Sequence, residues 1–167
     1  MVGKKIMDLI EHYEEQINIY RDMYAVVEAQ YQLCAEADFA VGDSLKRLNL
    51  LLSRRQRQMD LIEGNQAEVG VIKESLQREL GLEEVNVETL TRVFPSPETA
   101  QLQSVVQRIE SLLKDISTLD TETQKLLKVK LNLVKQEMGK IQTGKKATRA
   151  YNPAGRQREG YFIDGSK

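Results

Sequence analysis

The sequence predicts an all-α protein: an elongated antiparallel bundle of about three long helices with coiled-coil character, followed by an irregular C-terminal tail. Two observations carry this prediction. Apolar residues recur at steps of three and four over long stretches, which is the period of an amphipathic helix, and only three prolines occur in 167 residues. The composition, with 29% charged residues, 5% aromatic residues and no Trp, is typical of helical rods.

The first helix is predicted over about 4–37. Cys34, the only cysteine, is expected as a small buried side chain, and it rules out an intrachain disulfide. The helix carries a coiled-coil seam in which steps of four and three alternate and four of nine residues are tyrosine. Tyrosine rings pack while their hydroxyl groups reach water, so this seam fits the edge of a bundle core or a partly wet groove. The seam comprises Ile6, Ile10, Tyr13, Ile17, Tyr20, Tyr24, Val27, Tyr31 and Cys34.

A second helix is predicted over about 44–80. Gly42 and Asp43 favour a turn near 38–43 with Asp43 as the N-cap, although the register would also allow one unbroken helix through both segments. The apolar pattern keeps one register across Gly64, so we expect a single helix that is weakened there. Its stripe comprises Leu45, Leu48, Leu52, Met59, Ile62, Val69, Leu76 and Leu80.

A connector over 82–95 leads to the third long helix. Gly81 is suited to end the second helix, and Asn86 can cap a single turn within the connector. This turn is expected to carry three apolar side chains onto the core: Leu90, Val93 and Phe94.

The third long helix is predicted over about 97–142. Ser96 provides a capping hydroxyl and Pro97 fits the first helical position. About 46 residues at ~1.5 Å each make a rod of roughly 69 Å, so other helices must lie along it. Residues 120–125 contain no apolar side chain and the stripe restarts with an offset. We therefore expect the two halves of this helix to face different surroundings.

The chain is predicted to divide into a helical bundle over 1–144 and a flexible basic tail over 145–167. From Lys140 onward, seven Lys or Arg residues stand against two acidic residues, which gives this end +5 and leaves −6 for the rest of a chain whose net charge is −1. The tail carries Tyr161, Phe162 and Ile163 in sequence. Such a triplet fits a segment that folds on a partner or one that docks on its own bundle, and the residues favour neither.

The residues do not form a recognisable catalytic or metal-binding pattern. His12 is the only histidine, expected at the surface or core boundary, and a zinc site would need about four Cys or His ligands. Cys34 cannot pair with His12 for catalysis because 22 residues of helix separate them by roughly 33 Å. No glycine-rich phosphate loop, signal-peptide core or membrane span is present in the sequence. We expect a cytoplasmic, non-enzymatic protein without metal or cofactor.

Motifs with a family likeness occur along the chain: Gly42-Asp43 with Leu45 and Leu48, Arg54-Arg55-Gln56 ahead of Met59 and Ile62, Glu79-Leu80-Gly81-Leu82, Val87-Glu88-Thr89-Leu90, Leu126-Leu127, Tyr151-Asn152-Pro153, Gly155 and Phe162-Ile163-Asp164. Together they resemble the FlgN-type flagellar export chaperones, which serve a type III secretion apparatus, and the resemblance covers nearly the whole chain. At two places the sequence departs from the family pattern: Asp120 and Thr123 stand where asparagines are frequent, and Gly165-Ser166-Lys167 stands where lysines often follow.

This resemblance implies a cytoplasmic chaperone that holds hook-associated proteins of the hook–filament junction by their C-terminal amphipathic helix. Such a chaperone prevents premature assembly and brings its clients to the export gate and ATPase. We place the client groove on the second half of the third helix, because its stripe is offset and it adjoins the tail, which would act as a mobile flap. The expected contact residues are Leu127, Leu131, Val134 and Met138 of the helix, and Tyr151, Tyr161, Phe162 and Ile163 of the tail.

Two other functions stay open at this point. A structural coiled-coil protein or adaptor would satisfy its seams in a homo-oligomer. A nucleic-acid binder would use Lys145, Lys146 and Arg149 with the aromatic residues of the tail, but the acidic body would repel a duplex, so we expect no nucleic-acid partner. A chaperone for the filament cap or the filament itself would look much the same from sequence.

Overall fold

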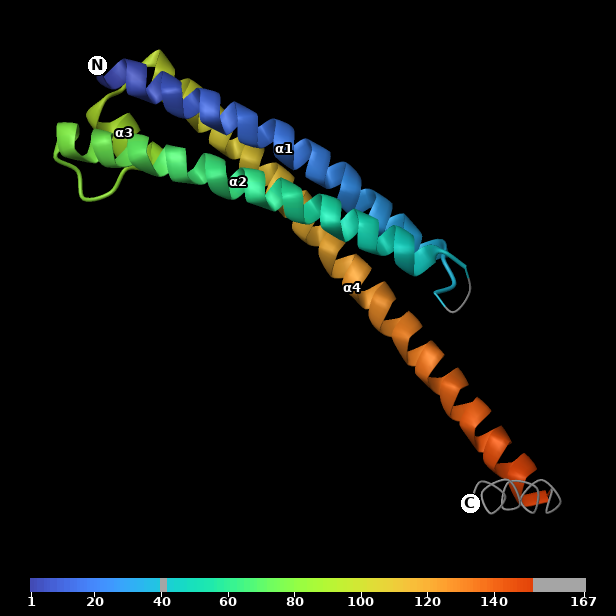
Figure 1. Ribbon diagram of the computed structural model, residues 1–167. Coiled ribbons are helices and arrows are strands. Elements are labelled where there is room, and N and C mark those ends of the chain that lie inside the picture. The colour runs from blue at the N-terminus through green and yellow to red at the C-terminus, as the bar shows by residue number, and fades with distance from the viewer. Residues whose placement is uncertain (40–41, 152–167) are drawn as a thin grey trace, which may run out of the picture. The chain divides into compact units, whose positions relative to one another are not determined.

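The computed structural model describes residues 1–39 and 42–151, with side chains up to 149, and this part of the chain is all-α, as predicted. The four helices in the described residues are α1 (Val2–Glu36), α2 (Ser44–Leu80), α3 (Val87–Val93) and α4 (Pro97–Tyr151) (Figure 1). The chain divides into two compact units, residues 1–124 and residues 125–167, and α4 contributes to both.

Helices α1 and α2 form an antiparallel hairpin rather than one continuous helix. Ala37 follows α1 in an extended conformation, and Gly42 has a φ of 82°, a left-handed conformation that glycine adopts without steric cost. Asp43 is the N-cap of α2, as predicted, but its side chain accepts no capping hydrogen bond. In Figure 1 the two helices run side by side along their length.

The core of the first unit lies between α1, α2, α3 and residues 97–124 of α4. None of the nine seam residues of α1 is exposed: Tyr13, Tyr24 and Tyr31 are half-buried, and the other six are buried. Burial raises the pKa of Tyr20 above its ordinary 10.0, because the charged phenolate would be desolvated. Cys34 is fully buried, as expected. The largest buried side chains come from all four helices: Ile6, Leu9, Ile17, Leu76, Leu90 and Leu102.

The apolar stripe predicted for α2 is only partly buried. Leu45, Leu52 and Met59 are 56%, 48% and 50% exposed. Four other members of the stripe face the core and form a column of seven-residue steps with Arg55; its first two members are half-buried and the last three are buried: Leu48, Arg55, Ile62, Val69 and Leu76. The two columns lie side by side on one helix, so the apolar pattern alone did not distinguish them.

Local capping motifs join α2, α3 and α4. Gly81 ends α2 with a φ of 63°, as expected for a C-terminal glycine. The Asn86 side chain accepts a hydrogen bond from the backbone N–H of Thr89 at 2.8 Å, and Thr89 Oγ1 accepts one from the backbone N–H of Asn86 at 3.0 Å. Leu90 is buried, as predicted, whereas Val93 is exposed. Phe94, the C-cap residue of α3, is half-buried against the core, so two of the three predicted side chains reach it.

Helix α4 is longer than predicted. It begins at Pro97, and Ser96 Oγ accepts a hydrogen bond from the backbone N–H of Thr99 at 3.3 Å. The helix continues to Tyr151, past Gly144 and past the expected end near residue 142. A helix-interior glycine costs only about 1 kcal/mol, and helix-forming Lys, Gln and Ala residues surround this one. The first seven residues of the expected irregular tail are thus helical, and residues 152–167 lie outside the described part.

Candidate functional site

An ion pair between α2 and α4 marks a change in the character of α4. Arg55 Nη1 donates to Asp120 Oδ1 at 2.6 Å, and Arg55 Nη2 contacts Asp120 Oδ2, so the pair is bidentate. Arg55 Nη1 also lies 3.5 Å from Oε1 of Gln30 on α1. Three helices therefore meet in one polar layer. It includes Asp120, the first residue of the segment of α4 that lacks apolar side chains.

Before this layer α4 has buried apolar side chains, whereas after it no apolar side chain of α4 is fully buried among the described residues. Leu102, Val105, Ile109 and Ile116 are all buried. Thr123 is the last buried residue of α4 among those described, and its hydroxyl donates to the Leu119 carbonyl at 2.8 Å. The expectation that the two halves of this helix face different surroundings is confirmed within the described residues.

The predicted client-binding stripe lies in the second unit. Leu127, Leu131, Val134 and Met138 follow steps of four, three and four, which places them on one face of α4. Leu127 and Val134 are half-buried, while Leu131 and Met138 are 55% and 56% exposed. The described part of this unit, residues 125–151, is one helix, so no second helix within it covers this face. We call these four residues the α4 stripe.

The tail residues assigned to the same site cannot be placed beside it. Tyr151 is the last residue of α4, and its side chain is not described. Tyr161, Phe162 and Ile163 lie outside the described residues. Ile141, which the sequence analysis left out of the site, is exposed and extends the α4 stripe by a further step of three. Its signal was present in the sequence, because it stands fourteen residues after Leu127.

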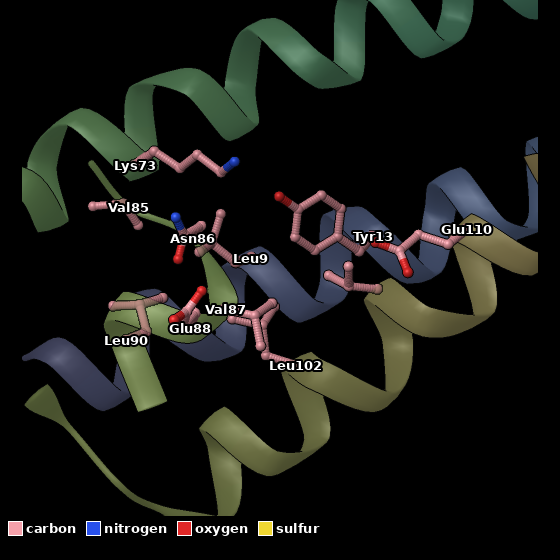
Figure 2. Close-up of a pocket in the computed structure, with 11 residues that line it drawn as sticks. Leu9, Tyr13, Lys73, Val85, Asn86, Val87, Glu88, Leu90, Leu102 and Glu110 are labelled. Atoms are coloured by element: carbon pink, nitrogen blue, oxygen red, sulfur yellow. The ribbon is translucent and has the colours of Figure 1, made fainter. Parts of the chain in front are cut away.

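The first unit also contains a pocket beside α3, of about 280 Å³. Leu9, Leu90 and Leu102 form part of its apolar lining, and Figure 2 shows Tyr13 and Lys73 pointing toward one another next to them. This volume is slightly below the usual range of ligand pockets, which begins near 300 Å³. We assign the pocket no ligand.

The histidine takes part in a polar cluster at the core boundary, where it was expected. His12 Nδ1 lies 3.4 Å from Glu68 Oε2 and 3.8 Å from Glu15 Oε2. Asn65 donates to Glu15 at 2.9 Å and accepts from Gln16 at 2.8 Å. These bonds fix the register of α1 against α2. Within the described part of the chain, no group of three His, Cys, Asp or Glu residues could hold a metal ion.

Comparison with known proteins gives one match. None of the helices in the described residues combines the length and apolar character that a membrane crossing needs. No curated protein and no solved structure shows significant similarity to the chain. A family model described as FlgN protein, however, matches residues 1–159, which is nearly the whole chain. This all-α chain therefore belongs to the FlgN family of flagellar export chaperones.

Proposed function

We propose that this chaperone acts in the cytoplasm by binding the C-terminal amphipathic helix of hook-associated proteins, the components of the hook–filament junction. By covering that helix it prevents premature assembly, and it hands the client to the export gate or ATPase of the flagellar type III apparatus. The protein acts by binding rather than by catalysis. Family membership supports the chaperone role. The client class is what the resemblance to FlgN-type chaperones implies, and the site is inferred from the residues.

The exposed α4 stripe is the observation that carries the proposal. Apolar side chains at i, i+4, i+7 and i+11 form the pattern with which one helix packs along another. Leu131 and Met138 are more than half exposed, so a client helix that covered them would remove a large apolar area from water. The free chaperone thus presents the surface that the client's own amphipathic helix needs.

Residue types in and near the stripe fit several related clients. Met138 has a flexible, polarizable side chain that adapts to differently shaped partners. Leu127, Leu131 and Val134 supply apolar area without a hydrogen bond that would select one sequence. We expect the chaperone to bind more than one hook-associated protein, each through its own terminal helix.

Charged substitutions in the stripe test its placement. Leu131→Asp together with Val134→Asp should weaken client binding by at least about tenfold, because two carboxylates would be buried against an apolar helix. Val129→Asp is the matched control, since Val129 is equally exposed on the opposite face of the same helix. Isothermal titration with the client's C-terminal segment measures both. Unchanged affinity in the double variant, with helical content retained, would remove the site from α4.

A coiled-coil oligomer is the alternative that the same stripe supports. In that case the stripe of one copy would pack on that of another, and the protein would form a fixed dimer or trimer. Light scattering across a range of concentrations distinguishes the two. A monomer that becomes a one-to-one complex supports the chaperone, whereas a stable oligomer that Leu131→Asp dissociates supports the structural role.

A further inference from the structure

The N-terminal part of α2 is a basic segment on an acidic body. Residues 44–59 contain five Lys or Arg residues and no Asp or Glu, whereas the residues before Lys140 together carry −6. Arg55 is engaged by Asp120. The other four cations are exposed, and no ion pair joins them to a carboxylate in the described residues: Lys46, Arg47, Arg54 and Arg57.

One flank of this segment combines arginines with leucines. Leu50 and Leu61 are 62% and 61% exposed. Three of the four cations stand with these two leucines at sequence steps of three and four. The five side chains therefore lie in one line along the helix. We call this line the arginine–leucine strip: Arg47, Leu50, Arg54, Arg57 and Leu61.

A groove adjoins the strip where α1 ends and α2 begins. It has a volume of about 370 Å³, and its lining includes Arg47 of the strip and Glu36 of α1. Leu33 and Leu51 supply apolar lining, and the small side chain of Ala29 leaves room between the helices. The groove has room for an apolar side chain of a partner, and Arg47 and Glu36 place charges of opposite sign at its lining.

Acidic side chains of α1 lie beside the arginine–leucine strip, on the neighbouring helix. His12 lies close to both Glu15 of α1 and Glu68 of α2, which shows that these two columns adjoin. Seven-residue steps from Glu15 lead to the exposed Asp22 and Glu36, and steps back from Glu68 lead to the arginine–leucine strip. The flank therefore has cations on its α2 side and carboxylates on its α1 side.

This arrangement fits a helix better than a nucleic acid or a membrane. A duplex or an anionic bilayer would meet the α1 carboxylates next to the arginines, and a duplex would leave the leucines unexplained. The outermost face of α2 is polar, with Asn49, Ser53 and Gln56 exposed, and it separates the leucines of the strip from the exposed leucines of the other flank. A helix can place apolar residues on the leucines and acidic residues beside the arginines.

We propose that the arginine–leucine strip and its groove bind an amphipathic helix of a partner protein that carries Asp or Glu along the edge facing α2. This surface lies within residues 1–124 and uses no residue of the α4 stripe, so it is a second docking site beyond the proposed client groove. The helix enters with an apolar residue toward the groove, and its acidic edge complements the three arginines of the strip.

Fluorescence anisotropy with a model helix tests the proposal on the full chain. The probe is a labelled synthetic amphipathic peptide with leucine on one face, glutamate along one flank and serine along the other, used where it is monomeric, and its counterpart carries lysine in place of glutamate. The glutamate peptide should bind more tightly, and less so at high salt. Leu50→Ser with Leu61→Ser should weaken binding about tenfold. Arg54→Glu with Arg57→Glu should do the same and reduce the salt dependence.

Matched variants separate this surface from its surroundings. Leu45→Ser with Leu52→Ser changes two exposed leucines on the other flank of α2, and Lys4→Glu with Lys114→Glu changes two exposed lysines elsewhere, so both should leave binding unchanged. The α4 stripe variants should also leave it unchanged, so loss of client binding and loss of this site are distinguishable. Equal binding of the lysine peptide, or strip variants that bind normally, would overturn the proposal. So would tighter binding to phosphatidylglycerol vesicles or a DNA duplex, or self-association that the strip variants abolish.

Discussion

The ion pair between Arg55 and Asp120 is the residue-level contact that ties α2 to α4. The two side chains are 23% and 28% exposed, so solvent screens them less than a surface pair, and the bidentate geometry adds a second charge-assisted bond. Asp120→Ala should therefore destabilise the fold by about 1–3 kcal/mol, because a half-buried guanidinium loses its partner. Urea unfolding measures this, and a double-mutant cycle with Arg55→Ala isolates the pair. A coupling energy near zero would show that the pair contributes no stability.

A second residue-level prediction concerns Gln58, which is 92% buried on α2. Its Oε1 atom has no hydrogen-bond partner in the described part of the structure. An unsatisfied buried carbonyl costs about 1–3 kcal/mol, so Gln58→Met should raise the free energy of unfolding by roughly 1 kcal/mol. Gln66→Met, at an exposed position of the same helix, should have little effect. A destabilised Gln58→Met variant would mean that this oxygen is satisfied in solution.

At the scale of the element, the burial pattern of α2 makes a prediction that the sequence pattern does not. Leu52 and Leu76 look equivalent in the apolar stripe, but Leu52 is half exposed and Leu76 is fully buried. Leu76→Ala should cost about 2–5 kcal/mol, whereas Leu52→Gln should change stability by less than about 0.5 kcal/mol. Thermal and urea unfolding give both values. If the two substitutions cost the same, Leu52 is buried in solution.

How far the sequence predicts each element depends on whether its signal is local. Gly81 and Asn86 act through their own backbone and nearest neighbours, so the end of α2 and the start of α3 were predictable. The buried face of α2 depends on which helices pack against it, and nothing near Leu45 in sequence carries that information. Gly144 indicated a helix end near residue 142, but the helix-forming residues on either side of it outweighed that local preference, and α4 continues past it. The α4 stripe was found because its apolar period is local in the sequence. The arginine–leucine strip was not found, because its interpretation depends on the carboxylates that the fold of α1 places beside the arginines.

At the scale of the whole molecule, the two compact units have different characters. Residues 1–124 bury apolar side chains from all four helices, whereas residues 125–151 form one helix with most of its apolar side chains exposed. A unit without its own core is at the low-stability end of a structure and gains order by binding. The central claim of the proposed function is that the first unit supplies stability and the second unit binds the client.

Isothermal titration of the full chain with the C-terminal segments of hook-associated proteins from the same genome tests this claim most directly. The proposed function predicts a one-to-one complex with a negative heat-capacity change, because a client helix buries the apolar α4 stripe. It also predicts that a client segment without its terminal helix gives no heat of binding. No binding to any of these segments, together with a stable oligomer of the free protein, would contradict it and identify the stripe as a coiled-coil interface.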